Sequence, residues 1–258
     1  MPDIDTPEIL PGAEPWSTDG TGPGAPGALC IHGFTGNPTS MRPVAEAFAA
    51  AGFAVELPRL PGHGTTVEDM LTTSWEDWSA EAEAAYQRLA ARAGKVVVAG
   101  LSMGGTLTVW LATRHPEIAG IVPINAAVAP QQPEVVEMVK GMVDEGELVM
   151  PGIGSDIAKP GVVESAYEST PLKPLLSLVG VLDELGSKLG GITCPVLIMT
   201  SPQDHVVDPA ASDLLAAAVS GPVERVTLER SYHVATVDYD AELIQQQAVE
   251  FGRKVTAE

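Results

Sequence analysis

The chain has 258 residues, which suits one globular domain with a large core, and 45% of them are hydrophobic, which argues against disorder. Its 34 aspartates and glutamates exceed its 14 lysines and arginines, which gives a formal net charge of −20. Such a surface repels phosphate backbones and anionic lipid head groups, so nucleic acid is excluded as a partner, whereas uncharged substrates are not.

The first 27 residues are rich in proline, glycine and acid, and they predict an irregular lead-in or a short hairpin. Apolar runs suited to buried strands then alternate with helical patterns, which predicts an α/β fold with a mostly parallel sheet covered by helices on both faces. The predicted strands cover residues 28–33, 53–60, 95–101, 119–127, 194–200 and 223–229. The predicted helices cover residues 38–52, 74–94, 103–115, 209–220 and 239–255.

The helix predicted over 74–94 has the clearest signals. Ser74 and Asp77 have the spacing of a capping box, and an apolar stripe that includes Trp75 and Trp78 follows. The two tryptophans are therefore interpreted as core residues.

Residues 128–193 interrupt the alternation. They hold short helical pieces, several prolines and glycines, and three of the eight methionines, Met138, Met142 and Met150. A structureless loop of this length is uncommon in a compact domain, so we predict an inserted helical cap over the carboxyl edge of the sheet. The core then comprises residues 1–127 and 194–258, and open α/β sheets bind their ligands at that edge.

The sequence shows no signal for export or for membrane insertion. The stretch MPDIDTPEIL lacks the basic start and apolar centre of a secretory signal, and no apolar run reaches the length of a membrane span. Cys30 and Cys194 lie far apart and are expected to be free thiols in a reducing compartment, so a cytoplasmic location is expected. No cluster has the spacing of metal ligands, and neither a metal nor a cofactor is expected.

The stretch KVVVAGLSMGGT, residues 95–106, places one serine between a predicted strand and a predicted helix. Gly100 and Gly104 flank Ser102 in the G-x-S-x-G pattern of a nucleophile elbow. Such a turn strains the backbone of its central residue, and the glycines relieve the crowding around it. It sets the hydroxyl at a helix N-terminus, where free N–H groups favour negative charge. We predict Ser102 as a nucleophile.

A serine hydroxyl needs a base to take its proton, and five histidines compete for that role. His233 follows the last predicted strand, so it should lie at the same edge of the sheet as Ser102, and we predict it as the base. Two aspartates beyond it, Asp238 and Asp240, fit the start of the last helix. The other histidines have local structural interpretations: His32, His63, His115 and His205.

The base needs a buried carboxylate that fixes its tautomer and stabilises the imidazolium. The segment SPQDHVVDP offers Asp204 and Asp208. Asp208 precedes Pro209, a combination typical of a helix start, so we predict Asp204 as the acid. The chain order Ser102, Asp204, His233 is the one that this architecture requires.

The reaction also needs two donors for the negative charge that develops on the substrate carbonyl oxygen. The backbone N–H of Met103, directly after the nucleophile, is the first expected donor. The HGFTG loop is expected to supply the second through the N–H of Phe34, because Gly33 allows a tight turn there. The Phe34 ring can simply pack in the core, since the backbone role does not depend on it.

Six stretches together resemble the α/β-hydrolase family, and within it the bacterial monoacylglycerol lipases and their carboxylesterase relatives. They are HGFTGNPTSMRP, LPRLPGHGTT, GLSMGGTLT, GIVPINAAV, DHVV and SYHVATVDYD, and the resemblance runs from about residue 28 to the C-terminus. It implies the α/β-hydrolase fold with an inserted cap, and the same nucleophile, base, acid and oxyanion donors. It also implies that Ile153 and Glu164 lie near the alcohol half of an ester; a solvated helix face is the alternative for Glu164.

The resemblance implies a serine hydrolase of carboxylic esters, with monoacylglycerol as the substrate. A short-chain carboxylesterase or a thioesterase is the alternative within the same chemistry, and a non-hydrolytic binding protein is the alternative from another class. The apolar side chains of the cap fit an acyl-chain tunnel or ordinary packing against the core. Its outer face also fits transient contact with a lipid surface, and hence a peripheral membrane association.

Overall fold

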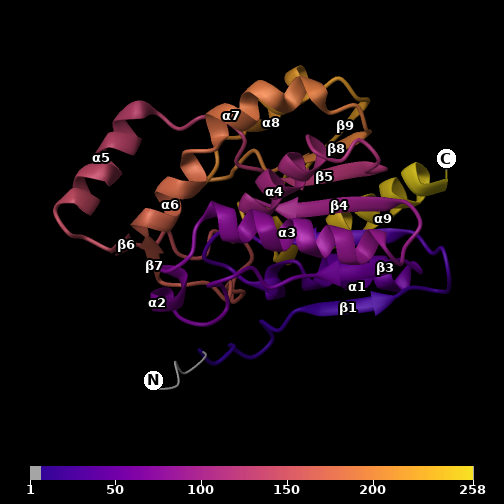
Figure 1. Cartoon of the computed structure of the whole chain (residues 1–258), viewed down its shortest axis with the longest axis horizontal. Helices are drawn as coiled ribbons and strands as arrows, with labels where there is room; N and C mark the ends of the chain where they lie inside the picture. Colours follow the sequence, from indigo (N-terminus) through magenta and orange to yellow (C-terminus); the bar gives the residue numbers. More distant parts are fainter. Residues whose placement is uncertain (1–6, 258) are drawn as a thin grey trace.

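The computed structural model describes residues 7–257, which form a seven-stranded sheet with helices on both faces (Figure 1). The strand order is β1-β3-β2-β4-β5-β8-β9, and all neighbours are parallel except β1, which runs antiparallel to β3. The α/β fold class with a mostly parallel sheet is therefore confirmed. The strands of this sheet are β1 (Trp16–Asp19), β2 (Gly27–Ile31), β3 (Ala54–Leu57), β4 (Val96–Leu101), β5 (Gly120–Ile124), β8 (Val196–Thr200) and β9 (Val223–Thr227).

The helices of the core follow the predicted pattern: α9 keeps its predicted length with a shift of two residues, and the other predicted helices are shorter than expected. They are α1 (Arg42–Ala50), α2 (Val67–Met70), α3 (Trp75–Ala90), α4 (Met103–Ala112), α8 (Ala210–Ala218) and α9 (Ala241–Ala257), with the short 3-10 helices η1 (Pro38–Ser40) and η3 (Ala235–Val237). At the start of α3 the Ser74 N–H donates to Asp77 Oδ2 at 2.9 Å, which confirms the predicted capping box. The four-residue α2 was not predicted.

The core has two layers because successive strand residues point to opposite faces of the sheet. Val98 of β4 belongs to the layer that includes buried residues of α3, α4 and α8, whereas its neighbour Val97 belongs to the layer that includes α1 and α9. Trp75 and Trp78 are buried in the first layer, as predicted. Each strand of the parallel part is therefore apolar on both sides, which explains the near-continuous apolar runs in the sequence.

The lead-in prediction was wrong for residues 16–19. They form the edge strand β1, in which Trp16 pairs with Leu57 and Asp19 with Ala54, rather than an irregular segment or a hairpin of their own. Alternate residues of β1 are exposed, and WSTD contains no apolar run that could reveal a strand. The first six residues of the lead-in lie outside the described part of the chain.

Residues 128–193, predicted as the cap, contribute no described strand to the seven-stranded sheet. In Figure 1, α5 and α6 lie beyond the end of the sheet toward which the β4 arrow points. The strands β6 and β7 form a separate antiparallel pair. The elements of this segment are α5 (Pro133–Asp144), β6 (Val149–Pro151), β7 (Ser169–Pro171), α6 (Leu172–Val179), α7 (Leu182–Lys188) and η2 (Leu189–Gly191).

Neither cysteine takes part in a disulfide. Cys30 is buried in β2 and Cys194 is half-buried before β8, and burial raises the pKa of the Cys194 thiol to about 11. Both thiols are thus uncharged at neutral pH and act as small apolar groups. Across residues 7–257, no helix combines the length and the apolar character that crossing a bilayer requires.

Candidate functional site

Ser102 occupies the sharp turn between β4 and α4. Its backbone has φ 55° and ψ −118°, a conformation that an L-residue rarely adopts. The residue caps the N-terminus of α4, and its side chain lines a cavity. The turn therefore has the strained geometry that the G-x-S-x-G pattern predicts.

The two flanking glycines are required by close backbone contacts. A Cβ on Gly104 would collide with the carbonyl oxygen of Ile31 at the end of β2, and a Cβ on Gly100 would collide with the Gly104 carbonyl. The first turn of α4 therefore packs directly on the backbone of β2 and β4. This contact fixes the direction in which the Ser102 hydroxyl leaves the sheet.

His233 and Asp204 come together from two loops that follow adjacent strands. His233 Nδ1 lies 2.7 Å from Asp204 Oδ2, and the two side chains are 8% and 2% exposed. The other oxygen of Asp204 accepts the N–H groups of Val206 and Val207, both at 2.8 Å. This turn aims the carboxylate at the imidazole and fixes the tautomer with a proton on Nδ1, since a carboxylate can only accept.

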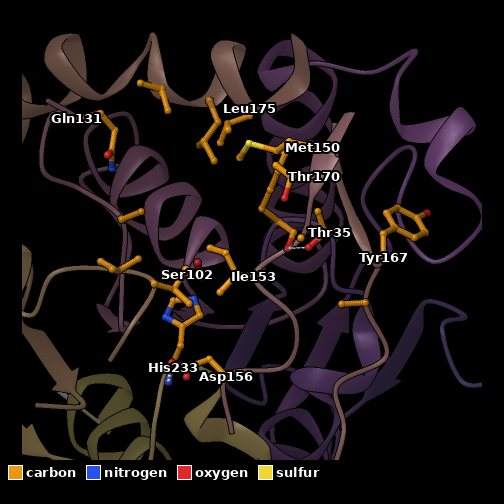
Figure 2. Close-up of a pocket in the computed structure, with 18 of the residues that line it drawn as sticks. Thr35, Ser102, Gln131, Met150, Ile153, Asp156, Tyr167, Thr170, Leu175 and His233 are labelled. Atoms are coloured by element: carbon orange, nitrogen blue, oxygen red, sulfur yellow. Dashed lines mark hydrogen bonds between the residues drawn. The ribbon is translucent and has the colours of Figure 1, made fainter. Parts of the chain in front are cut away.

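The imidazole stands beside Ser102 at the floor of the same cavity (Figure 2). In the described part of the chain, the Ser102 hydroxyl has no hydrogen-bond partner, His233 included. Nucleophile–base hydrogen bonds are often long before substrate binds, so this geometry is compatible with proton transfer. The structure thus brings the three predicted residues Ser102, Asp204 and His233 into one place.

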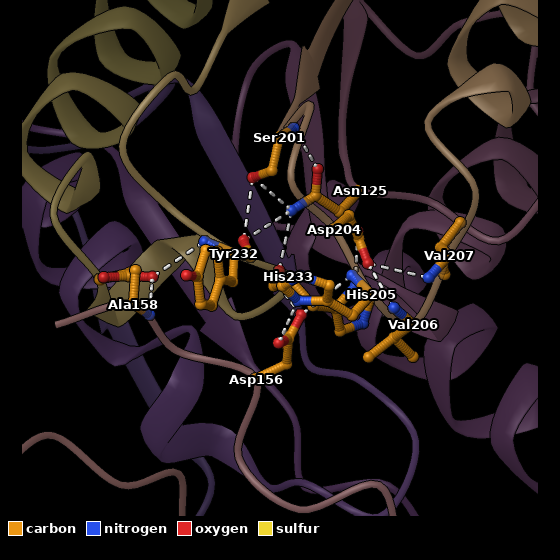
Figure 3. A network of polar contacts seen from close by, with 11 residues as sticks. Asn125, Asp156, Ala158, Ser201, Asp204, His205, Val206, Val207, Tyr232 and His233 are labelled. Carbon is orange, nitrogen blue, oxygen red and sulfur yellow. Dashed lines mark hydrogen bonds and ion pairs between the residues drawn. The ribbon is translucent and has the colours of Figure 1, made fainter. Parts of the chain in front are cut away.

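Asn125, at the end of β5, was missed by the sequence reasoning. Its Nδ2 donates to the His233 carbonyl at 2.8 Å and to Ser201 Oγ at 3.0 Å, while its Oδ1 accepts the Ser201 N–H at 2.8 Å (Figure 3). Its backbone φ of 44° is the local signal of a special role. Asn125 therefore ties the loop after β8 to the loop that carries His233.

The two predicted oxyanion donors flank the serine. A Cβ on Gly33 would lie 4.0 Å from Ser102 Oγ, so the HGFTG loop runs directly past the hydroxyl. Among residues 7–257, neither Phe34 nor Met103 uses its backbone N–H in a hydrogen bond with the protein. The Phe34 ring packs edge-on against Trp78, with 5.6 Å between ring centres, so it belongs to the core while its backbone reaches the cavity.

The remaining histidines do not reach Ser102. His32 accepts the Leu60 N–H at 3.1 Å and shapes its own loop, as predicted. His63 packs 5.0 Å from the His32 ring, and burial lowers its pKa to about 4. His115 bridges Glu83 and Glu117 at the surface. The contacts of His115 with the two glutamates were not predicted from the sequence.

The cavity above Ser102 has a volume of about 250 Å³ and is walled mainly by apolar side chains of the cap segment. Val139 comes from α5, while Leu175, Leu176 and Val179 come from α6. The methionine that reaches it is Met150 of β6 (Figure 2). A narrow apolar cavity of this kind suits an alkyl chain.

Glu164 and Ile153 both line this cavity. Residues 162–167 form no helix, so the solvated helix face considered for Glu164 is wrong. A Cβ on Gly36 would lie 2.8 Å from Glu164 Oε1, which places the carboxyl against the HGFTG loop. Desolvation raises the pKa of Glu164 to about 7, although the charge of His233 opposes this shift. Ile153 is 66% exposed and stands at the opening.

The sequence profile of the alpha/beta hydrolase family matches residues 28–246. The chain belongs to the α/β-hydrolase family. This member is 48% identical over 249 residues to the thermostable monoacylglycerol lipase of Bacillus sp. (strain H-257), across 95% of this chain and 96% of that lipase. It is 26% identical over 229 residues to the carboxylesterase of Bacillus subtilis (strain 168), across 88% of this chain and 92% of that one.

A solved structure shows the same fold over nearly the whole hydrolase. It comes from work on LipS and LipT, two metagenome-derived lipolytic enzymes, and it matches with a TM-score of 0.90 and 43% identity. The match covers 96% of this chain and 100% of that chain, so it includes residues of the cap segment as well as the core. The family and the fold that the sequence motifs indicated are confirmed.

We expect Glu164→Gln to stabilise the protein more at pH 8 than at pH 5. The folded-state pKa of about 7 lies above the usual 4.5, so the folded chain holds a proton that the unfolded chain releases between these values. The free energy of unfolding of the wild type therefore falls as the pH rises through that window, and glutamine removes the loss. Thermal unfolding at both pH values measures the effect. The exposed Glu147→Gln serves as the control, and an equal gain at both pH values contradicts a raised pKa.

Proposed function

We propose that this chain is a serine ester hydrolase that converts a monoacylglycerol to glycerol and a free fatty acid through an acyl-enzyme. The observation that carries the proposal is the 2.7 Å contact between His233 Nδ1 and Asp204 Oδ2, beside Ser102 in an apolar cavity. The relative that is 48% identical and named a monoacylglycerol lipase supports the substrate class.

In the first half-reaction Ser102 Oγ attacks the ester carbonyl carbon while His233 Nε2 takes the hydroxyl proton. The carbonyl oxygen becomes an oxyanion, which the N–H groups of Phe34 and Met103 stabilise. Asp204 remains ionised and stabilises the imidazolium. When the tetrahedral intermediate collapses, the bond to the alcohol oxygen breaks and His233 returns the proton to the leaving glycerol.

Water then takes the place of the alcohol. His233 removes a proton from the water as its oxygen attacks the acyl carbonyl, and the same two N–H groups hold the second oxyanion. Collapse breaks the bond to Ser102 Oγ, which recovers its proton from His233. The fatty acid leaves, and the enzyme is back in its first state.

Two parts of the cavity wall suit the two parts of the substrate, the acyl chain and the glycerol. The apolar side chains of α5 and α6 suit the acyl chain, and this segment, residues 128–193, acts as the cap over the core of 1–127 and 194–258. Glu164 and Ile153 suit the glycerol end, where a polar group and an apolar edge face the opening. The protonated fraction of Glu164 can donate to a glycerol hydroxyl and the ionised fraction can accept from one.

The outer surface of the cap suits contact with an uncharged lipid surface. Val163 is 79% exposed, Met138 57% and Leu148 53%, which concentrates large apolar side chains on the cap segment. Because the net charge is −20, anionic head groups are repelled, and zwitterionic lipid or the substrate's own aggregates are the favoured surface.

The preference among esters distinguishes a monoacylglycerol lipase from a broad carboxylesterase. The second possibility is supported by the relative that is 26% identical and named a carboxylesterase. We expect kcat/KM for 1-monolauroylglycerol to exceed those for a diacylglycerol and for a short p-nitrophenyl ester, since the cavity holds one long acyl chain. Steady-state kinetics on the three substrates measures this order. A clear preference for the short ester instead assigns the chain to the carboxylesterases.

Replacing Ser102 with alanine should lower kcat for monoacylglycerol hydrolysis by about 10⁴-fold or more, because it removes the oxygen that attacks the carbonyl. A fluorophosphonate probe should label the wild type and leave the variant unlabelled. A circular dichroism spectrum and a Tm like those of the wild type control for folding. Retained hydrolysis would falsify the nucleophile assignment, and a wild type that is neither labelled nor active is a binding protein.

The lipid contact predicts that the chain cosediments with phosphatidylcholine vesicles and not with phosphatidylglycerol vesicles. Changing both Met138 and Leu148 to serine should weaken the cosedimentation, because these side chains are exposed on the cap and do not line the cavity. Leu214→Ser, at an exposed position of α8 in the core, is the matched control. Equal cosedimentation of the double variant and the control contradicts the proposed lipid contact.

A further inference from the structure

Asp156 belongs to the cap segment, between β6 and β7, yet its side chain lies against both loops that carry the base and the acid. Its side chain is 12% exposed, and one oxygen, Oδ2, accepts the His233 N–H at 3.0 Å and the His205 N–H at 3.1 Å. The other oxygen lies 2.8 Å from His205 Nδ1. Figure 3 shows this carboxylate directly beside the two histidines.

The backbone of the base is consequently held from two sides. Asn125 binds the His233 carbonyl from the core, and Asp156 binds the His233 N–H from the cap segment. The Asp156 carbonyl also accepts the Val234 N–H at 3.1 Å. With both backbone groups of His233 fixed, the position of its ring depends on side-chain torsions alone.

The same carboxylate reaches the loop of the acid. His205 directly follows Asp204, and Asp156 binds both the backbone N–H and the ring of His205. One carboxylate therefore sets the spacing between the loop after β8 and the loop after β9, which the Asp204–His233 contact must span. A displacement of about 1 Å in such a contact can cost about 100-fold in rate.

The Asp156 carboxyl is ionised at neutral pH. Burial acts to raise its pKa, but the hydrogen bonds from His205 and His233 outweigh burial, and its pKa is lowered. Hydrogen bonds to an ionised acceptor are shorter and stronger than those between neutral groups. The negative charge on Asp156 therefore strengthens its hydrogen bonds with the N–H groups of His205 and His233.

We infer that Asp156 is a positioning residue for ester hydrolysis: it fixes the loops of His233 and Asp204 relative to each other from the cap segment. This inference rests on the proposed function. Asp156 also lines the cavity, so the cap segment would both wall the cavity and hold the two catalytic loops.

A second carboxylate, Asp238, should keep the cap segment attached to the core when the Asp156 side chain is removed, so the inference can be tested by substitution. Asp238 accepts the N–H of Ala158 at 2.7 Å and that of Lys159 at 2.9 Å. It also accepts the Tyr232 N–H at 2.9 Å, so it joins the cap segment to the His233 loop independently of Asp156. Removing the Asp156 side chain therefore leaves residues 158–159 attached.

The experiment compares Asp156→Ala and Asp156→Asn with the wild type on 1-monolauroylglycerol. We expect the alanine variant to lose about 10- to 100-fold in kcat with little change in KM, because the apolar side chains of α5 and α6 still line the cavity while the base is displaced. Asparagine keeps one oxygen for the two N–H groups and should recover most of the loss. The rate of fluorophosphonate labelling should follow kcat, since it reports on Ser102 activation without a glycerol contact.

Controls separate positioning from general damage. Asp144→Ala, an exposed aspartate of the same cap segment, should match the wild type. If the alanine variant does not fold, Asp156→Glu replaces it: the charge stays, the carboxylate shifts by a methylene, and kcat should again fall alone. Wild-type kcat in the folded variant, or a loss confined to KM, overturns the inference while leaving the proposed function intact. A wild type without activity on any ester overturns both.

Discussion

The whole site depends on the close approach of Gly104 to the carbonyl oxygen of Ile31. Because no side chain separates them, the first turn of α4 rests on the end of β2, and the turn before it must bend sharply enough to give Ser102 a φ of 55°. The same approach places the HGFTG loop, which continues β2, against the serine. One backbone contact thereby sets both the direction of the Ser102 hydroxyl and the position of the loop that carries Phe34, the two groups proposed as nucleophile and oxyanion donor.

Buried carboxylates organise the rest of the site, and they do so with backbone N–H donors instead of cations. Asp204, Asp156 and Asp238 each accept at least two backbone N–H groups. Hydrogen bonds to its ionised form lower the pKa of Asp156 although burial acts to raise it. The Glu164 carboxyl accepts no backbone N–H within residues 7–257, and burial raises its pKa to about 7.

The parts of the site that depend on local sequence were predictable, and the parts that depend on contacts between distant residues were not. The nucleophile turn, the order of strands and helices, and the choice of Asp204 over Asp208 follow from local rules on glycine, proline and apolar periodicity. Asp208 does serve the start of α8, since its side chain accepts the Ala210 N–H at 2.9 Å. Asp238 was interpreted as a helix-start residue, but it also binds the cap backbone 80 residues earlier in the chain. Asn125 and Asp156 act through contacts at similar sequence distance, and β1 carries too few apolar residues to be recognised. Long-range polar contacts leave no periodic signal in a single sequence.

The cap segment is anchored unevenly, and this bears on how a substrate reaches Ser102. The Asp156 side chain accepts the His233 N–H of the core, and the Asp238 side chain of the core accepts the N–H groups of residues 158 and 159. Residues 156–159 are therefore attached to the core. In α5, by contrast, Val139 is the buried residue among the twelve of the helix, and Met138 is largely exposed. Segments with few buried contacts open at a lower cost in free energy than segments held by buried hydrogen bonds. The end of the cap segment beside His233 is therefore held to the core by buried hydrogen bonds. The α5 end combines few buried residues with exposed apolar side chains, which suits the part of the segment proposed to contact lipid.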